Sequence, residues 1–319
     1  MGRRGHGNAV VVGVDATPGA LDATAWAARE ARMRRQPLRI VHAIDGPDDP
    51  DHAPEVYRIL DRAVRAARTA APGISVRVEV ETAEPLELLE RESAIASVVA
   101  VGPPGPGGLT RRIVESAGGL AAGTLAPLVV VPEVPPPDRD PAIAVLVDTS
   151  SSGVMAIVAA VAAAARRRVG VRAVRLPDPG ESARESAATL EALVRRARSA
   201  YPEVDIDTQL AAGRPVRVLA DLSAQVDLVV VGAREFGPDS ALALGAVRQS
   251  LLGLARCPVM IVPARLAPSR PHLSRPAATE WPHTADSSPS HATSRHPAGH
   301  PVGGAVGTGH LIGLRSEPV

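Results

Sequence analysis

The sequence contains no lysine, so all 35 of its basic residues are arginines. This absence excludes a P-loop lysine, a Schiff-base lysine and any lysine nucleophile. Aromatic residues make up only 2% of the chain, which argues against a protein that stacks nucleobases on aromatic side chains. The single cysteine, Cys257, excludes an internal disulfide and a cysteine-based zinc site.

Long apolar segments are missing as well. The first apolar run, 9–14, ends in Asp15 and is too short for a signal peptide. The longest apolar helix candidate, 154–165, is shorter than a membrane span. Charge is balanced, with 35 basic and 34 acidic residues, which argues against a general nucleic-acid binder. We therefore expect a soluble cytoplasmic protein that binds neither a membrane nor a nucleic acid.

The sequence does contain one pattern that occurs twice. The segment Ala9-Val-Val-Val-Gly-Val-Asp15 recurs 133 residues later as Ala142-Ile-Ala-Val-Leu-Val-Asp148. The pair Arg34-Arg35 recurs at the same offset as Arg167-Arg168. Further apolar runs recur in the same order at nearly the same offset, so the chain carries one structural unit in tandem, over residues 8–132 and 141–263.

Within each unit, short Val/Ile/Leu runs alternate with segments of helical period. Continuous apolar runs indicate strands that are covered on both faces, as in a parallel sheet. Alternating strands and helices indicate an open, doubly wound sheet. The sequence thus predicts an α/β protein of two tandem Rossmann-like, flavodoxin-sized domains with five parallel strands each. The expected strands are 9–14, 38–43, 74–80, 97–101 and 128–131, then 142–147, 171–176, 204–210, 227–231 and 259–262.

Two segments outside these units have a different composition. The joint, 133–140, is rich in proline and short, which predicts a linker that holds the units close together. Residues 264–319 are rich in Ser, Pro and Gly and carry six of the nine histidines, which predicts a disordered tail. Two of these histidines, His296 and His300, have a metal-site spacing, but no ordered scaffold accompanies them. We expect no metal site.

Ligands of open parallel sheets bind at the carboxyl ends of the strands, where the strand order reverses. Asp15 and Asp148 each end the first strand of a unit. Their carboxylates could accept hydrogen bonds from a base or ribose, or cap the following helix through Thr17 or Ser150, and the sequence does not decide between these readings. Gly102 and Gly232 end the fourth strands, where glycine lets a phosphate approach the backbone or simply ends a strand.

Two segments carry a resemblance to a known family. Residues 10–31, Val-Val-Val-Gly-Val-Asp-Ala-Thr-Pro-Gly and onward, resemble the opening of a universal stress protein domain, and residues 245–263, Gly-Ala-Val-Arg-Gln-Ser-Leu-Leu-Gly and onward, resemble its close. The resemblance covers both units. It implies a Rossmann-like fold that pairs through its last strand. The tandem chain then resembles a dimer fused into one polypeptide, with intramolecular pairing of its two domains.

The resemblance also implies a site for ATP. ATP-binding members of the family carry Gly-x2-Gly-x9-Gly-[Ser/Thr] after strand 4, with the strand-1 aspartate near the adenine. Here Glu115 replaces the third glycine of the first unit, Glu235 replaces the middle glycine of the second, and Ala246 lacks the hydroxyl. Both sites are therefore expected to be degenerate, with the first unit the better candidate. The implied contacts are Val14, Asp15, Ala43, Gly102, Gly105 and Ser116, and in the second unit Asp148, Gly232, Gly245 and Val247.

Three functions are compatible with the sequence. The leading hypothesis is a non-enzymatic stress-response or regulatory protein with an ATP-type site. The second is a nucleotide-independent interaction scaffold, which the loop substitutions favour. The third is an adenylyl-transferring enzyme on the same scaffold, but the sequence shows neither the phosphate motifs of such enzymes nor an acid–base constellation. We expect no catalytic residues, and unknown protein partners.

Overall fold

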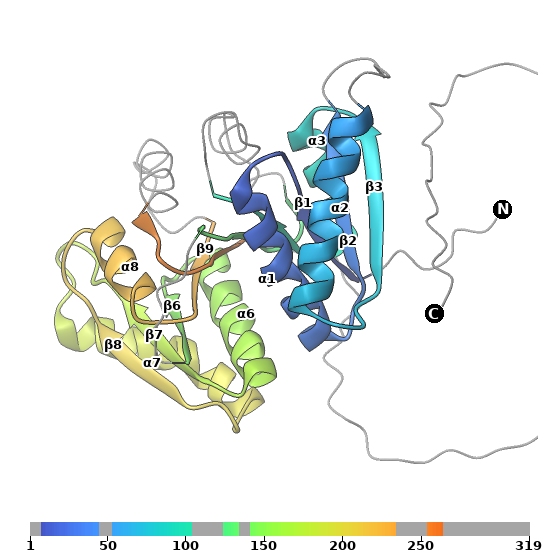
Figure 1. Cartoon of the computed structure of the whole chain (residues 1–319). Helices are drawn as coiled ribbons and strands as arrows, with labels where there is room; N and C mark the ends of the chain where they lie inside the picture. Colours follow the sequence, from blue (N-terminus) through green and yellow to red (C-terminus); the bar gives the residue numbers. More distant parts are fainter. Residues whose placement is uncertain (1–7, 45–52, 104–123, 134–140, 234–253, 264–319) are drawn as a thin grey trace, which may run out of the picture. The chain divides into compact units, whose positions relative to one another are not determined.

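Helices and strands alternate along the parts of the chain that the computed structural model describes, residues 8–44, 53–103, 124–133, 141–233 and 254–263 (Figure 1). The first unit contains β1 (Ala9–Gly13), α1 (Pro18–Arg34), β2 (Leu38–Ile44), α2 (Ala53–Ala70), β3 (Val76–Thr82), α3 (Pro85–Ser93), β4 (Ala96–Val101) and β5 (Leu128–Val130). The second contains β6 (Ala142–Leu146), α6 (Ser151–Arg167), β7 (Gly170–Arg175), α7 (Ala183–Ala200), β8 (Ile206–Leu210), α8 (Pro215–Ser223), β9 (Leu228–Gly232) and β10 (Val259–Val262).

All ten expected strands form, and they join into one sheet rather than two. The strand order is β3-β2-β1-β4-β5-β10-β9-β6-β7-β8. Neighbours within each unit run parallel, whereas β5 and β10 pair antiparallel, with Val129 opposite Met260. The two units are thus joined through their last strands, as the family resemblance implies. In each unit the strand order reverses beside the first strand, between β1 and β4 and between β6 and β9.

The sheet separates a shared core from two local ones. Buried residues of α1, α2, α6 and α7 form one continuous apolar layer on one face, which includes Val129 and Met260 at the seam between the units. On the opposite face, α3 covers the first unit and α8 covers the second, each with a separate cluster. The long Val-rich strands β1, β4 and β9 are buried along their length, as continuous apolar runs predict.

Local sequence signals explain where several helices begin. Ser150 caps α6 by accepting a hydrogen bond from the Gly153 N–H at 3.0 Å, so the Ser150–Gly153 segment starts a helix. Ser182 and Glu185 form a reciprocal capping box at the start of α7. Cys257 is fully buried beside β10, as expected of a small apolar side chain.

Other expectations fall partly or wholly outside the described residues. The expected linker lies outside them apart from Glu133, and the expected tail, 264–319, lies outside them entirely. Among the helices of the described residues, none is long and apolar enough to cross a membrane.

Candidate functional site

At the carboxyl end of β1, the carboxylate of Asp15 closes a turn. Its Oδ1 accepts a hydrogen bond from the backbone N–H of Thr17 at 2.9 Å and another from the Thr17 hydroxyl. This Asx-type arrangement leads directly into α1, where Thr17 is the N-cap residue but makes no side-chain capping bond of its own. For this oxygen, the structure therefore favours the role of bracing the helix start.

The loop after β4 packs closely on the start of α1. A Cβ on Gly102 would lie 2.9 Å from the backbone carbonyl carbon of Gly19 and 3.0 Å from the Ala20 nitrogen. A Cβ on Gly19 would lie only 2.3 Å from Cδ of Pro103. Glycine is required at both positions because backbone and ring atoms meet there. Pro103 thus packs directly against the start of α1, and it lacks an N–H to offer a phosphate.

Carboxylates gather around the same helix start. Burial raises the pKa of Asp22, and the nearby negative charge of Glu133 raises it further, against the opposing effect of Arg29. The Cγ atom of Glu133 would lie 3.4 Å from a Cβ on Gly19. A helix N-terminus ordinarily attracts anions. Here the negative charges of Asp15, Asp22 and Glu133 already occupy that region, which disfavours a phosphate.

The second unit repeats the turn with different helix-start chemistry. Oδ1 of Asp148 accepts hydrogen bonds from the Ser150 N–H at 2.8 Å and from the Ser150 hydroxyl at 2.6 Å. Gly153 leaves room for this carboxylate, since a Cβ there would lie 2.0 Å from the same Oδ1. By the repeat offset, Met155 stands where the first unit has Asp22. Ala233, after β9, stands where the first unit has Pro103.

The second strands of the units carry different polar residues, His42 and Arg175, at corresponding positions. In the first unit, Nδ1 of His42 lies 2.8 Å from the backbone carbonyl of Val14. A carbonyl only accepts, so this ring nitrogen carries the proton. In the second unit, the corresponding Arg175 is buried, and its guanidinium contacts Asp178 and Glu181, each at 3.0 Å. Only the offset of the repeat could have paired them in advance.

Family comparisons agree with this geometry. The model of the universal stress protein family matches residues 8–132 and 141–263. The universal stress protein Rv2028c of Mycobacterium tuberculosis is 32% identical over 267 residues, which cover 79% of this chain and 95% of that protein. A second protein of that organism, Rv2005c, is 30% identical over 290 residues, covering 81% and 97%.

The chain belongs to the universal stress protein family. Its fold is that of a crystal structure of a universal stress protein from Archaeoglobus fulgidus, with a TM-score of 0.59 over 80% of this chain and 96% of that one. The sequence identity to that protein is 14%, so this likeness concerns the fold alone.

The structure brings together some of the site residues that the family resemblance implies. Val14 is buried at the end of β1, where its N–H bonds to the Val41 carbonyl at 3.0 Å, and Ala43 is half-buried on the neighbouring strand. Gly102 directly follows β4 and Gly232 is the last residue of β9, so the described site residues of each unit share the carboxyl edge of the sheet. The remaining four lie outside the described residues: Gly105, Ser116, Gly245 and Val247.

This family member also has a charged cluster on the α3 face, which sequence reasoning missed. One carboxylate oxygen each from Glu79, Glu81 and Glu92 lie within 4.8 Å of one another. Arg39 contacts two of these carboxylates, Glu92 at 3.0 Å and Glu79 more closely. Arg91 contacts the third carboxylate, that of Glu81, so two guanidinium groups supply the positive charge that such a trio needs, and we read the cluster as structural.

Glu92 gives the cluster a predictable pH dependence. Burial raises the pKa of Glu92, and Glu79 and Glu81 raise it further, although Arg39 and Arg91 oppose the shift. A carboxyl whose pKa is higher in the folded state stabilises the fold when protonated, and this contribution is lost as pH rises through the folded pKa. We expect the unfolding free energy of the wild type to fall relative to that of Glu92→Gln as pH rises from about 4 to 7. Urea denaturation across this range measures the difference, and parallel pH profiles would contradict it.

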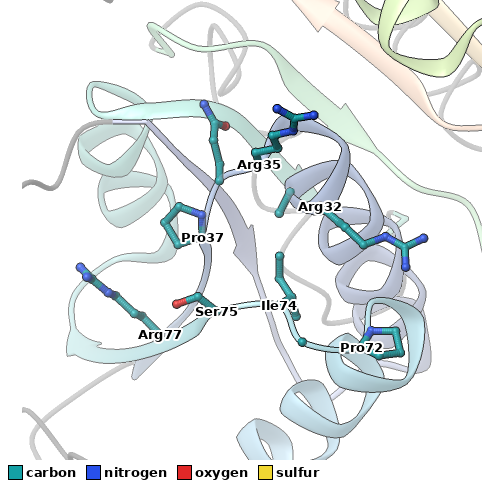
Figure 2. Close-up of a pocket in the computed structure, with 10 residues that line it drawn as sticks. Arg32, Arg35, Pro37, Pro72, Ile74, Ser75 and Arg77 are labelled. Carbon is teal, nitrogen blue, oxygen red and sulfur yellow. The ribbon is translucent and has the colours of Figure 1, made fainter. Parts of the chain in front are cut away.

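A shallow hollow of about 440 Å³ lies at the opposite, amino-terminal edge of the first unit (Figure 2). It is lined in part by Arg32, Arg35 and Arg77, all exposed, at the end of α1 and the starts of β2 and β3. Figure 2 shows the three guanidinium groups pointing in different directions rather than toward one point. Ligands of open parallel sheets bind at the carboxyl edge, and this hollow lies at the other edge.

Proposed function

We propose that this protein is a non-enzymatic stress-response regulator whose ATP-type nucleotide site is degenerate in both units. Family membership supports the regulatory role, and the carboxyl edge of the sheet supports the location of the site. The observation that carries the degeneracy is the start of α1. There Pro103 packs on Gly19, and the pKa of Asp22 is raised by burial and by the nearby negative charge of Glu133.

The loop motif and the residues around the helix start favour different units for the stronger residual nucleotide affinity. The loop motif alone favours the first unit, because it retains two glycines and the serine. Around the helix start, however, the second unit is the more open to an anion, since it has Met155 and Ala233 in place of Asp22 and Pro103. We therefore assign the stronger residual nucleotide affinity to the second unit.

The proposal that the protein is not an enzyme rests on how its polar groups are used. At the strand ends, Asp15 and Asp148 each accept hydrogen bonds within their own turns. The Nδ1 proton of His42 is held by a backbone carbonyl. Groups engaged in this way support the structure of the turns rather than general acid–base chemistry, which requires a side chain in hydrogen-bond reach of a substrate proton.

The test is calorimetry of the full chain with ATP and Mg²⁺. A carboxylate about 4 Å from a phosphate charge costs roughly 4 kcal/mol at an effective dielectric of 20, which corresponds to nearly a thousandfold in affinity. We expect the wild type to bind in the millimolar range, and Glu235→Gly to bind up to about a thousandfold more tightly. Glu115→Gly should gain less, because Pro103 and the neighbouring carboxylates remain.

A control variant and three aspartate variants make this test specific. Glu203→Gly removes an exposed glutamate at the opposite edge of the second unit and should leave ATP binding unchanged. Asp148→Ala in the Glu235→Gly background should reduce the regained affinity, because the turn before α6 loses its brace. Micromolar binding by the wild type that neither aspartate variant, Asp15→Ala or Asp148→Ala, affects would contradict the proposed site. An absence of binding in every variant would favour the nucleotide-independent scaffold.

A further inference from the structure

Helices α1 and α6 are copies of one another, and they end in the same way. Each has 17 residues, and the residues that follow, Arg35 and Arg168, both adopt the left-handed conformation. The repeat offset aligns Arg34 with Arg167 at the last helical position. Two of the charge differences in this alignment lie near the helix ends, where the first helix has Glu30 and Met33 and the second has Ala163 and Arg166.

Glu30 is fully buried, and its carboxylate joins the two units. Within α1 its Oε1 accepts a hydrogen bond from Nε of Arg34 at 2.5 Å. From α6 its Oε2 accepts one from Arg167 at 2.5 Å, and Arg166 lies 3.7 Å from Oε1. Burial raises the pKa of Glu30, but the three guanidinium groups outweigh this effect and lower it below its ordinary value. One carboxylate therefore serves arginines from both halves of the chain.

The same charges would be poorly balanced if two copies of the second unit paired with each other. If two second units paired with each other, Arg166 and Arg167 of both copies would meet around Ala163, with no carboxylate between them. Even in the observed arrangement, burial lowers the pKa of Arg166 to about 10, and its Nε lacks a hydrogen-bond partner among the described residues. Buried charges without a counter-ion are strongly destabilising, so this alternative interface is disfavoured.

We propose that Glu30 is a specificity determinant that makes the second unit pair with a first unit rather than with another copy of the second unit. The β5–β10 strand pairing supplies backbone hydrogen bonds that any two such edges could form. The buried carboxylate adds the discrimination, because only a pair containing one first unit and one second unit places it against the cationic end of α6. Specificity of this kind comes from penalising the wrong pair as well as from favouring the right one.

The experiment is hydrogen exchange of the full chain, read by mass spectrometry in peptides that cover β5 and β10. In Glu30→Ala, we expect exchange in these two strands to become at least tenfold faster, while β2 and β7, away from the seam, change much less. Glu92→Gln is the matched control. It removes another buried, arginine-paired carboxylate of the same unit, and it should leave β5 and β10 protected as in the wild type.

Moving the carboxylate from α1 to α6 distinguishes loss of the interface charge pairing from a general loss of stability. In Glu30→Ala combined with Ala163→Glu, the carboxylate moves to α6, four residues before Arg167, where the pseudo-symmetry of the helices also places Arg34 across the interface. We expect this double variant to restore at least half of the lost protection, whereas Ala163→Glu alone should not exceed wild-type protection. Unchanged exchange in Glu30→Ala would overturn the proposal. Equal exchange in Glu30→Ala and in the relocated variant would also overturn it.

Discussion

Replacing Met260 by Glu is expected to lower the free energy of unfolding by more than about 4 kcal/mol. Met260 is 1% exposed and lies on β10 at the seam, between Val129 of β5 and Val230 of β9. A glutamate there would be buried in the apolar layer that both units share, with no partner for its charge. Urea denaturation followed by circular dichroism measures the change.

Met33→Glu is the matched control for this prediction. Met33 is 36% exposed, near the end of α1, so a charge at that position stays in water. We expect its effect to remain within about 0.5 kcal/mol. Similar losses in the two variants would mean that the seam contributes no more to stability than an exposed helix surface. That result would contradict the conclusion that the two units share one apolar core.

Gly153→Ala is expected to destabilise the protein by about 1–3 kcal/mol. Alanine ordinarily favours a helix over glycine by nearly 1 kcal/mol, so steric conflict must reverse the sign. The new Cβ would lie 2.0 Å from Oδ1 and 2.7 Å from the backbone oxygen of Asp148. The turn that joins β6 to α6 would have to shift, and the Asp148–Ser150 hydrogen bonds would be lost with it.

Thermal unfolding of Gly170→Ala provides the comparison for this variant. A Cβ on Gly170 would meet only the Asp205 carbonyl oxygen, at 3.5 Å, which is ordinary van der Waals contact. This substitution should leave the midpoint of unfolding unchanged or slightly raised. A Gly153→Ala protein as stable as the wild type would show that the carboxylate of Asp148 does not hold the start of α6.

Much of the fold could be predicted because most strands coincide with continuous Val-rich runs in the sequence. The first residues of the two edge strands, β3 and β8, were predicted less well. The sequence predicts strands from 74 and 204, whereas β3 and β8 begin at Val76 and Ile206. The residues before them bond backward to the preceding helix turn instead, Ile74 to Ala71 and Val204 to Tyr201. Local apolar character cannot reveal this competition for backbone hydrogen bonds.

The candidate site could be located from the sequence but not understood. Asp15 and Asp148 stand where topology places ligands, yet a ligand contact and a helix brace would use the same carboxylate oxygens, so only distances could decide. Pro103 lacks an N–H in any conformation, but its packing on Gly19 joins residues more than 80 positions apart and could not be predicted from the sequence. In the sequence Glu30 has the i,i+4 spacing of a surface ion pair with Arg34, and its contact with Arg167 of α6 depends on the packing of two distant helices.

The central claim is that the nucleotide site is degenerate in both units and that the second unit retains the stronger affinity. The nucleotide content of the purified full-length protein tests this claim most directly. Nucleotides extracted by denaturation can be identified and counted by mass spectrometry. We expect the wild type to carry well under one nucleotide per chain, and Glu235→Gly to carry more than Glu115→Gly. One or more nucleotides per wild-type chain, or a larger gain in Glu115→Gly, would contradict this assignment.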